Sequence, residues 1–346
     1  MDKQRDRLAG QRRRQATIVD VAKTAGVAIG TVSRHLNGLP VRAANRDQIE
    51  RAIADLGYRR NSVAVSMKTD TTRIVGLMVP SLGEFHAALL EKLSRKMRLT
   101  GRAVLSFCHD MQPQSITEGL EFFASHRVDA LVIDGEERLR SQILKYVDEG
   151  LIVVLYDNDI PGLPVDRVFV ENRKASARMV DHLLDLGHER VATIHGNLRD
   201  SAARERLAGF HDAYAGHGMA ASPELVVSGD WRETGGYACL RDLMALSAPP
   251  TAVFCANYNM TLGALTWARE HGLAIPDDLS LVSFDDVPAF RMHSPAITAV
   301  GQPLEKIAEA ITQLLSDRLA DPGSMGRSTI AVECDIILRG SARRAR

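Results

Sequence analysis

Residues 17–38 read TIVDVAKTAGVAIGTVSRHLNG, and this stretch decides the fold of the N-terminal part of the chain. Thr17 stands before an apolar-periodic run and Asp20 follows three residues later, which approximates the capping box at the start of a helix. Gly26 supplies the freedom at positive φ that a tight turn between two crossing helices needs. The stretch therefore predicts a first helix that begins after Thr17 and ends at Gly26.

The helical pattern continues to Tyr58, with a second interruption at the turn sequence Asn37-Gly38-Leu39-Pro40. We predict three short amphipathic helices, which are enough for one compact helical domain. The second helix, Ile29 to Leu36, carries Thr31, Ser33 and Arg34 on its polar side. Because the planar fork of arginine matches the O6/N7 pair of guanine in the major groove, Arg34 is the predicted base contact.

The charge of the chain is unevenly distributed, although the formal net charge is zero. Residues 1–73 carry 15 Lys and Arg against 7 Asp and Glu, whereas the remainder carries 28 against 36. A basic end on an acidic body is typical of a protein that meets a polyanion through one part only. Residues 1–15 lack periodicity and predict a disordered arm, in which Arg12, Arg13 and Arg14 either form a solvated charge run or contact phosphate.

Beyond residue 73, short apolar runs alternate with helical patterns. Such runs are typical of buried parallel strands, and they lie at 74–79, 103–107, 130–133, 152–156, 191–194, 224–227, 252–255 and 280–284. Helices are predicted over 84–100, 115–126 and 138–149. The alternation predicts two doubly wound α/β halves in succession. Ligands bind such sheets beyond the carboxyl ends of the strands, so the predicted pocket is the cleft between the halves.

Several classes of protein are disfavoured. No apolar run reaches the length of a bilayer span, and residues 1–15 contain no apolar signal core, so we expect a cytoplasmic protein and not an exported binding protein for transport. We find no GxSxG, HExxH or Walker motif, so we expect no enzyme. The cysteines are scattered without metal-ligand spacing, and we expect reduced thiols with no metal and no cofactor. They are Cys108, Cys239, Cys255 and Cys334.

The segment 17–38 resembles the helix-turn-helix signature of the LacI-type (lactose/purine repressor) family, and RAIADLGYRRNSVAVSMK at 51–68 resembles the third helix and hinge of that family. A generic helical hairpin that binds no DNA is the alternative. The resemblance implies a transcription regulator, most simply a repressor, that binds a pseudo-palindromic operator in double-stranded DNA as a homodimer. It divides the chain into a disordered arm (1–15), a headpiece (16–60), a hinge (61–72), an effector-binding and dimerisation core (73–340) and a tail (341–346).

The resemblance also assigns DNA contacts. Bases face three residues of the second helix, phosphates face two polar residues, one residue steadies the turn, and an apolar side chain of the hinge forms a wedge in the minor groove. The base-facing residues are Ile29, Gly30 and Arg34, the phosphate contacts are Thr31 and Ser33, Asn37 steadies the turn, and Met67 of the hinge forms the wedge. Thr17, which precedes the first helix, completes the predicted DNA-binding set.

Four positions depart from the family pattern or qualify it. Ala28 stands where a capping Ser or Thr is usual, which removes a cap that contributes about 1 kcal/mol. Gly30 offers no side chain to a base, so readout there is weak or made by close approach of the backbone. Arg60 replaces a customary proline, which makes the entry to the hinge less rigid. Met67 replaces a leucine; it is competent as a wedge, and simple packing is the alternative.

Residues 73–340 resemble the periplasmic sugar-binding-protein-like core of the same family, in which two doubly wound parallel-sheet subdomains are interleaved. The matching segments are 202–210 (AARERLAGF), 250–257 (PTAVFCAN), 283–286 (SFDD) and 297–308 (ITAVGQPLEKIA). The whole fold class is thus an all-α helix-turn-helix headpiece on an α/β core.

The resemblance implies an effector site for a sugar or sugar derivative. A polyol needs planar donors, carboxylate acceptors and an aromatic face. The family pattern supplies them at Phe85, His86, Asp157, Arg206, Trp231, Asn257, Tyr258 and Asp285. Arg206 and Asp285 are the central pair, whereas Trp231 is equally typical of a core and Asp157 of a helix cap. Tyr258 departs from the aspartate common after this asparagine, which puts a simple transfer of sugar specificity in doubt.

Overall fold

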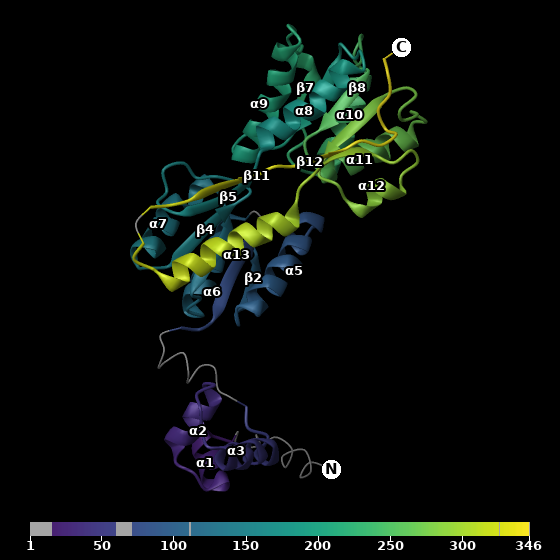
Figure 1. Cartoon of the computed structure of the whole chain (residues 1–346). Helices are drawn as coiled ribbons and strands as arrows, with labels where there is room; N and C mark the ends of the chain where they lie inside the picture. The colour runs from purple at the N-terminus through teal and green to yellow at the C-terminus, as the bar shows by residue number, and fades with distance from the viewer. Residues whose placement is uncertain (1–15, 60–70, 111, 325, 346) are drawn as a thin grey trace, which may run out of the picture. The chain divides into compact units, whose positions relative to one another are not determined.

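The computed structural model describes residues 16–59, 71–110, 112–324 and 326–345, and the described chain forms two compact units, 1–72 and 73–346. Figure 1 shows a small helical unit at the N-terminal end and a larger unit with two sheets. Met67 and most of the predicted hinge lie outside the described residues. Among the described residues, no helix is both long and apolar enough to cross a membrane.

Within residues 16–59 the first unit has three helices, as the sequence predicts: α1 (Ile18–Ala25), α2 (Ile29–Leu36) and α3 (Ala43–Leu56). The predicted capping box is present, because the backbone N–H of Asp20 donates to Thr17 Oγ1 and the carboxylate of Asp20 accepts from the backbone N–H of Thr17. Gly26 ends α1 at φ 65°. The helices enclose a small apolar core of Val21, Ala22, Ala25, Val32, Ile49 and Ala52.

The second unit contains two six-stranded sheets, each of which forms the centre of a subdomain. The strand order of the first sheet is β11-β5-β4-β3-β1-β2. All its strand pairs are parallel. The strands are β1 (Ile74–Val79), β2 (Ala103–Cys108), β3 (Ala130–Asp134), β4 (Ile152–Tyr156), β5 (Asp166–Val170) and β11 (Thr329–Val332). Helices α5 (Glu84–Leu99) and α13 (Leu304–Ala320) pack on one face; α6 (Pro113–Ser125), the short η1 (Glu137–Leu139) and α7 (Arg140–Asp148) pack on the other.

The second sheet has the order β12-β10-β9-β8-β6-β7 and is parallel except for β12 at its edge. Its strands are β6 (Val191–His195), β7 (Val226–Ser228), β8 (Ala252–Cys255), β9 (Ser280–Phe284), β10 (Thr298–Gly301) and β12 (Asp335–Ile337). Its helices are α8 (Asn172–Asp185) and α9 (Ser201–Gly216) on one face, α10 (Glu233–Met244) and α11 (Tyr258–Glu270) on the other, and the short η2 (Pro223–Leu225) and α12 (Pro288–Met292).

The two subdomains are interleaved and do not follow one another along the chain. The chain passes from the first sheet to the second after β5, returns through α13 and β11, and passes back into β12. The alternation of apolar runs predicted two successive halves, and that simple order is wrong because β11 and β12 come from the end of the chain. The predicted strand at 224–227 also shifts, since Pro223 begins a turn of 3₁₀ helix and β7 starts at Val226.

Residues 341–345 belong to the second subdomain and do not form a separate tail. Ser341 is completely buried, and its hydroxyl donates to the carbonyl of Leu281 and accepts from the backbone N–H of Thr298. The backbone N–H of Ala345 donates to the carbonyl of Leu186. The side chain of Arg343 also pairs with Asp277, so the basic composition of this segment does not make it a solvated tail.

Candidate functional site

The exposed face of α2 carries the residues predicted to contact bases. Ile29, Gly30 and Arg34 are exposed, whereas Val32 on the opposite side of the helix is fully buried in the core of the headpiece. Nearly half of the Ile29 side chain (48%) is open to solvent. A hydrophobic residue left exposed beside an arginine suits a surface that reads both thymine methyl groups and guanine edges.

The ends of α2 follow the sequence prediction closely. Ala28 occupies the N-cap and makes no side-chain capping bond, and Asn37 is the C-cap, whose backbone N–H donates to the carbonyls of Ser33 and Arg34. Ser33 and Thr31 are half-buried, and Thr17 is committed to the capping box of α1. The sequence reasoning missed two exposed apolar side chains of the headpiece, Val19 (53% exposed) and Leu39 (52%).

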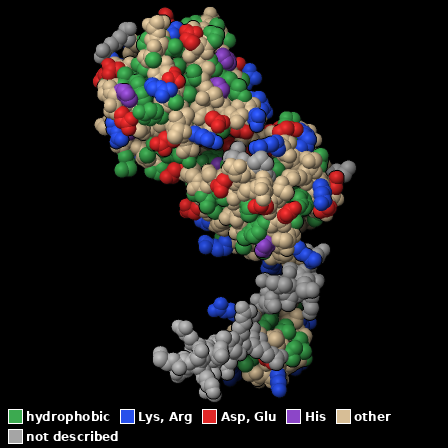
Figure 2. Space-filling model, turned by 180° about the vertical axis from the view of Figure 1, so that it is seen from behind, with side chains coloured by type: hydrophobic (Ala, Val, Ile, Leu, Met, Phe, Trp, Pro, Cys, Tyr) green, Lys and Arg blue, Asp and Glu red, His purple; other side chains and the backbone are tan. Residues whose placement is uncertain are grey.

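A cavity of about 460 Å³ lies in the core unit, and residues of both subdomains line it. Figure 2 shows acidic and basic side chains gathered where the two subdomains meet. All eight residues predicted to form the effector site line this cavity, namely Phe85, His86, Asp157, Arg206, Trp231, Asn257, Tyr258 and Asp285. Most of them follow directly on β-strands or begin helices, as expected for a ligand site at the carboxyl ends of parallel strands.

Arg206 of α9 is buried, with 3% of its surface exposed, and its side chain is held in one orientation. Its Nε donates to Asn172 Oδ1 at 2.8 Å and its Nη1 to the carbonyl of Ala256 at 2.6 Å. The guanidinium carbon lies 3.6 Å from the centroid of the Phe284 ring. With two nitrogens fixed and one face packed on an aromatic ring, the side chain presents its remaining nitrogen in a defined orientation.

The acidic partner predicted for Arg206 makes no ion pair with it. Asp285 accepts from Gln302 Nε2 at 2.7 Å and from the backbone N–H of Tyr258 at 3.3 Å. The two residues line the same cavity as separate donor and acceptor groups. Asn257 is also committed within the protein, because its Oδ1 caps α11 at the backbone N–H of Met260 and its Nδ2 donates to the carbonyl of Trp231.

Trp231 stands in the cavity wall and is fixed by its indole. Its Nε1 donates to Asp200 Oδ2 at 2.6 Å, and its ring lies over Gly196, where any Cβ would collide with it. Its backbone has a φ of 63°, a left-handed conformation that is costly for a bulky residue. The same conformation occurs at three other residues of this cavity, Asp157, Asp230 and Asp285. Strained backbone that concentrates around one cavity is typical of a functional site.

The wall from the first subdomain holds Phe85, His86 and Asp157. Burial raises the pKa of Asp157 to about 6; Arg206 lowers this pKa, and Asp285 and Asp200 raise it. Burial, together with the charge of His109, lowers the pKa of His86 to about 4, so the imidazole is neutral at pH 7. The rings of Phe85 and His86 meet edge to face at 5.0 Å between centroids.

The cavity contains polar residues that the sequence reasoning did not select, including Asp134, Asn158 and Asp200. Asp134 ends β3 and its carboxylate accepts from the side chain and the backbone N–H of Asn158. Burial raises the pKa of Asp134, and so does the charge of Asp157. Asp134 could have been predicted as a cavity residue from the sequence. It directly follows the apolar run 130–133, which was already predicted as a strand whose carboxyl end faces the cleft.

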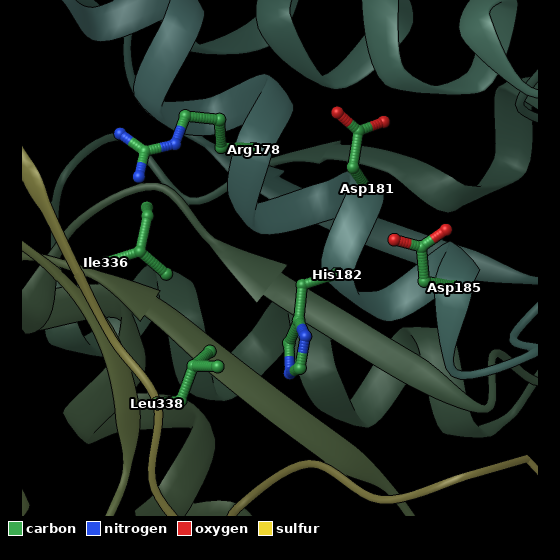
Figure 3. A pocket seen from close by; sticks show the side chains of 6 residues that line it. All are labelled: Arg178, Asp181, His182, Asp185, Ile336 and Leu338. Carbon is green, nitrogen blue, oxygen red and sulfur yellow. The ribbon is translucent and has the colours of Figure 1, made fainter.

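A second hollow of about 440 Å³ lies on the outer surface of α8 and the C-terminal strand segment (Figure 3). Arg178, Asp181, His182 and Asp185 of α8 line it together with two apolar residues, Ile336 and Leu338. The side chain of Asp185 is 73% exposed and Leu338 is 57% exposed. We assign no effector to this hollow, because so shallow a surface does not remove a small ligand from water.

Comparison with known proteins agrees with both units. The family "Bacterial regulatory proteins, lacI family" matches residues 17–61, and the family "Periplasmic binding protein-like domain" matches residues 180–342. The chain is 30% identical to the HTH-type transcriptional repressor PurR of Histophilus somni (strain 129Pt) over 335 residues, which cover 95% of this chain and 99% of the relative. It is 29% identical to PurR of Haemophilus influenzae (strain Rd) over 332 residues, with the same coverage.

Solved structures resemble the chain over nearly its full length. A transcriptional regulator CelR in complex with cellobiose is 28% identical, with a TM-score of 0.72, and the match covers 94% of this chain and 100% of that one. A lac repressor dimer bound to operator and the anti-inducer ONPF shares the fold at 23% identity, with a TM-score of 0.85 and coverage of 95% and 100%.

The helix-turn-helix headpiece and the two-subdomain core with its cavity define a DNA-binding regulator that responds to a small molecule. The chain belongs to the LacI family of transcriptional repressors. It binds operator DNA under the control of a small-molecule effector, and it is not an enzyme.

Proposed function

We propose that this repressor acts in the cytoplasm as a homodimer on a pseudo-palindromic operator, and that a sugar or sugar derivative in the core cavity controls its operator affinity. One observation carries the choice of effector class: a single cavity brings together the guanidinium of Arg206, the carboxylates of Asp157 and Asp285, and the indole of Trp231. A polyol uses all of these, because its hydroxyls donate to carboxylates and its C–H face stacks on an aromatic ring.

The charge of the cavity supports a ligand rich in hydrogen-bond donors. Three of its lining residues are arginines, whereas six are acidic, namely Asp134, Glu136, Asp157, Asp200, Asp230 and Asp285. Carboxylates only accept hydrogen bonds when ionised. A neutral polyhydroxyl compound satisfies such acceptors without bringing in a negative charge. Planar nucleobases are the second class to test, because Phe85 and Trp231 also offer ring faces for stacking.

The homodimer follows from the size of the headpiece. One short recognition helix contacts only a few bases, and two helices related by two-fold symmetry bind successive major grooves of a palindrome. The relative solved with operator is described as a dimer. Sedimentation at micromolar concentration should give a dimer, and a monomer with full operator affinity would contradict this part of the proposal.

Contacts across the cavity suggest how a ligand affects the angle between the subdomains. After β4, Asn158 Oδ1 accepts from the backbone N–H of Ala202 at 2.9 Å, and the backbone N–H of Asp159 donates to Ser201 Oγ at 2.8 Å. These bonds join the first subdomain to the start of α9. A ligand that interacts differently with the open and closed arrangements shifts the balance between them.

A thermal-shift screen of sugars, sugar acids and nucleobases against the purified protein tests the effector class. A bound ligand raises the melting temperature, since it binds the folded state alone. We expect a shift with one sugar or sugar derivative, and a gel shift with operator DNA should then change on adding the same compound. Shifts with nucleobases only would overturn the sugar assignment and leave the repressor assignment intact.

A further inference from the structure

Buried polar atoms without hydrogen-bond partners gather on the first-subdomain wall of the cavity. Within the part of the chain that the structure describes, eight buried side-chain polar atoms lack a partner. Two of them, His86 Nε2 and Asp157 Oδ1, belong to residues that line the cavity, and a third is the hydroxyl of Tyr156, the residue before Asp157. Each such atom lowers the stability of the fold when it is left without a partner. Three such atoms on neighbouring side chains indicate a group that binds there.

The backbone explains why these side chains converge. Asp134 at the end of β3 pairs in register with Tyr156 at the end of β4, so both side chains project from the same face of the sheet. Asp157 follows at once with a left-handed φ of 58°. His86 lies in the first turn of α5, the helix that packs on that face. One potential ligand atom each from His86, Asp134 and Asp157 lies within 4.8 Å of the other two.

Tyr156 provides the second, independent observation. It is completely buried, and its ring meets that of His86 edge to face with centroids 6.2 Å apart. Its hydroxyl interacts electrostatically with both Asp134 and Asp157 and has no hydrogen-bond partner. A tyrosine buried this deeply normally finds a partner. Its hydroxyl is placed to donate to a carboxylate or to a water molecule bound between the two aspartates.

We propose that His86, Asp134 and Asp157 bind a divalent transition-metal ion of the Zn²⁺ or Mn²⁺ class in the wall of the cavity. One imidazole nitrogen with two carboxylate oxygens is a donor set for borderline ions, whereas Mg²⁺ and Ca²⁺ prefer oxygen ligands alone. Two carboxylates neutralise the charge of the ion. Because ligand atoms stand about 2.0–2.2 Å from such ions, small side-chain rotations close the present spacing.

The ion has open coordination positions toward the cavity, because the protein supplies only three ligands. A water molecule or an oxygen of a bound polyol completes its shell. The three residues are far apart along the chain, which is why no ligand spacing is visible in the sequence. The inference goes beyond the proposed sugar response, and its test needs no organic effector.

A second grouping of the same residue types supplies a matched control. On the outer surface, His217 Nε2 lies 3.6 Å from Asp181 Oδ1 and 3.8 Å from Asp185 Oδ1. These side chains are 29–73% exposed, so any ion held there is weakly bound and well hydrated. His217→Ala removes the imidazole of the surface grouping and leaves the cavity unchanged. His86→Ala removes the imidazole of the cavity cluster and leaves the surface grouping unchanged.

The experiment is isothermal titration of the tag-free full-length protein with MnCl₂, ZnCl₂ and MgCl₂, with the Mn²⁺ binding repeated by electron paramagnetic resonance. We expect one Mn²⁺ or Zn²⁺ per chain and at least tenfold weaker binding of Mg²⁺. His86→Ala and Asp157→Asn should each weaken Mn²⁺ binding at least tenfold, and His217→Ala should leave it unchanged. Circular dichroism and the melting temperature of each variant establish that it is folded.

Three results would overturn the metal site: no saturable binding by the folded wild type, binding that His86→Ala and Asp157→Asn leave intact, or binding that only His217→Ala removes. A fourth result, a thermal shift with methylammonium chloride but with none of the three metal salts, would also overturn it, in favour of an organic cation. The metal site and the sugar site can be tested separately, because Arg206→Ala should remove the sugar response and retain the bound metal.

Discussion

Arg34 is the residue of α2 whose chemistry most directly specifies a base, and its guanidinium is exposed with Nη2 3.4 Å from the carbonyl of Pro40. We expect Arg34→Ala to relax the preference at one symmetric position of each half-site by about 1–3 kcal/mol, which is what a bidentate pair contributes to discrimination between bases. Competition binding with operator variants at that position measures the change in preference. If Arg34→Ala weakens all sequences equally, the residue contacts phosphate and not a base.

Tyr258 is the residue at which this chain departs from the common family pattern, and the structure places it in the cavity wall. A Cβ on Gly83 would overlap its hydroxyl, so the tyrosine reaches from the start of α11 to the start of α5. We expect Tyr258→Asp to change which compound gives a thermal shift, because the substitution adds an acceptor and opens space. Tyr258→Phe is the matched control; an unchanged ligand profile with Tyr258→Asp would mean that this residue does not set specificity.

Single residues show what a sequence reveals about a site and what it conceals. The resemblance to the family pattern selected eight residues, and all eight line the cavity. The sequence did not reveal that the side chain of Asn257 caps α11. It also did not reveal that Asp285 accepts a hydrogen bond from Gln302 and makes no ion pair with Arg206. Those partners depend on contacts between segments that are distant along the chain, which no local pattern records.

At the scale of elements, α13 is fixed to the first sheet by a buried ion pair. Arg318 near the end of α13 donates through Nε and Nη2 to Asp166 at the start of β5, at 2.6 and 2.9 Å. The two residues are 8% and 2% exposed. We expect Arg318→Ala to destabilise the core by about 3–5 kcal/mol, because it leaves a buried carboxylate unpaired. Chemical denaturation measures the change, with Arg269→Ala at an exposed position of α11 as the control.

The same pair gives the stability of the core a pH dependence. Burial by itself raises the pKa of Asp166, but the hydrogen bonds from Arg318 and from the backbone N–H of Ser328 outweigh it and hold this pKa below its usual value. A carboxyl whose pKa is lowered on folding stabilises the protein above its unfolded pKa of about 3.9 and loses this contribution as the pH falls through the folded value. The stability difference between wild type and Asp166→Asn should therefore stay constant from pH 7 to 5 and shrink below about pH 4. If the stability difference between wild type and Asp166→Asn already shrinks between pH 7 and 5, the Asp166–Arg318 pair is not the source of this pH dependence.

The elements that the sequence predicted are those with a strong local signal. Strands β1, β2, β3, β4, β6, β8 and β9 are dominated by apolar residues, and their bounds were predicted to within one residue. Strands β5, β10, β11 and β12 were not predicted. Their length does not explain this, because the predicted strand β8 has only four residues; their sequences DRVFV, TAVG, TIAV and DII instead have polar residues or glycine at their ends. β11 and β12 also depend on pairing with strands that come earlier in the sequence, since β11 pairs with β5 and β12 with β10.

At the scale of the whole molecule, the interleaved core provides a physical route from the cavity to DNA. The connections after β5, β10 and β11 all run between the subdomains, so a change in their relative angle moves three connections together. The headpiece precedes β1 in the chain, so the start of the first subdomain leads directly into the DNA-binding unit. In the proposed homodimer, we expect a ligand that favours one angle to change the free energy of placing two headpieces on one operator.

Met67, which lies outside the described residues, is the proposed wedge of the hinge. We expect Met67→Gly to weaken specific operator binding by about tenfold or more, since the variant has no apolar side chain to unstack a base step. Binding to nonspecific DNA should stay close to wild type, because the basic headpiece supplies it through phosphate contacts. Met67→Leu should retain the wedge. Operator binding by Met67→Gly that equals wild type and still responds to effector would rule out this hinge mechanism.

The most direct test of ligand-controlled repression is operator affinity, measured by fluorescence anisotropy at fixed salt with and without the compound that the thermal-shift screen identifies. We predict that the saturating compound changes wild-type operator affinity by about 5- to 150-fold, the usual range of allosteric coupling. Arg206→Ala should bind operator nearly as wild type and show no response, because removing its charge-assisted hydrogen bonds costs about 1.5–3 kcal/mol of ligand binding. Equal wild-type affinity with and without saturating compound, or an undiminished response in Arg206→Ala, would contradict control of repression through this cavity.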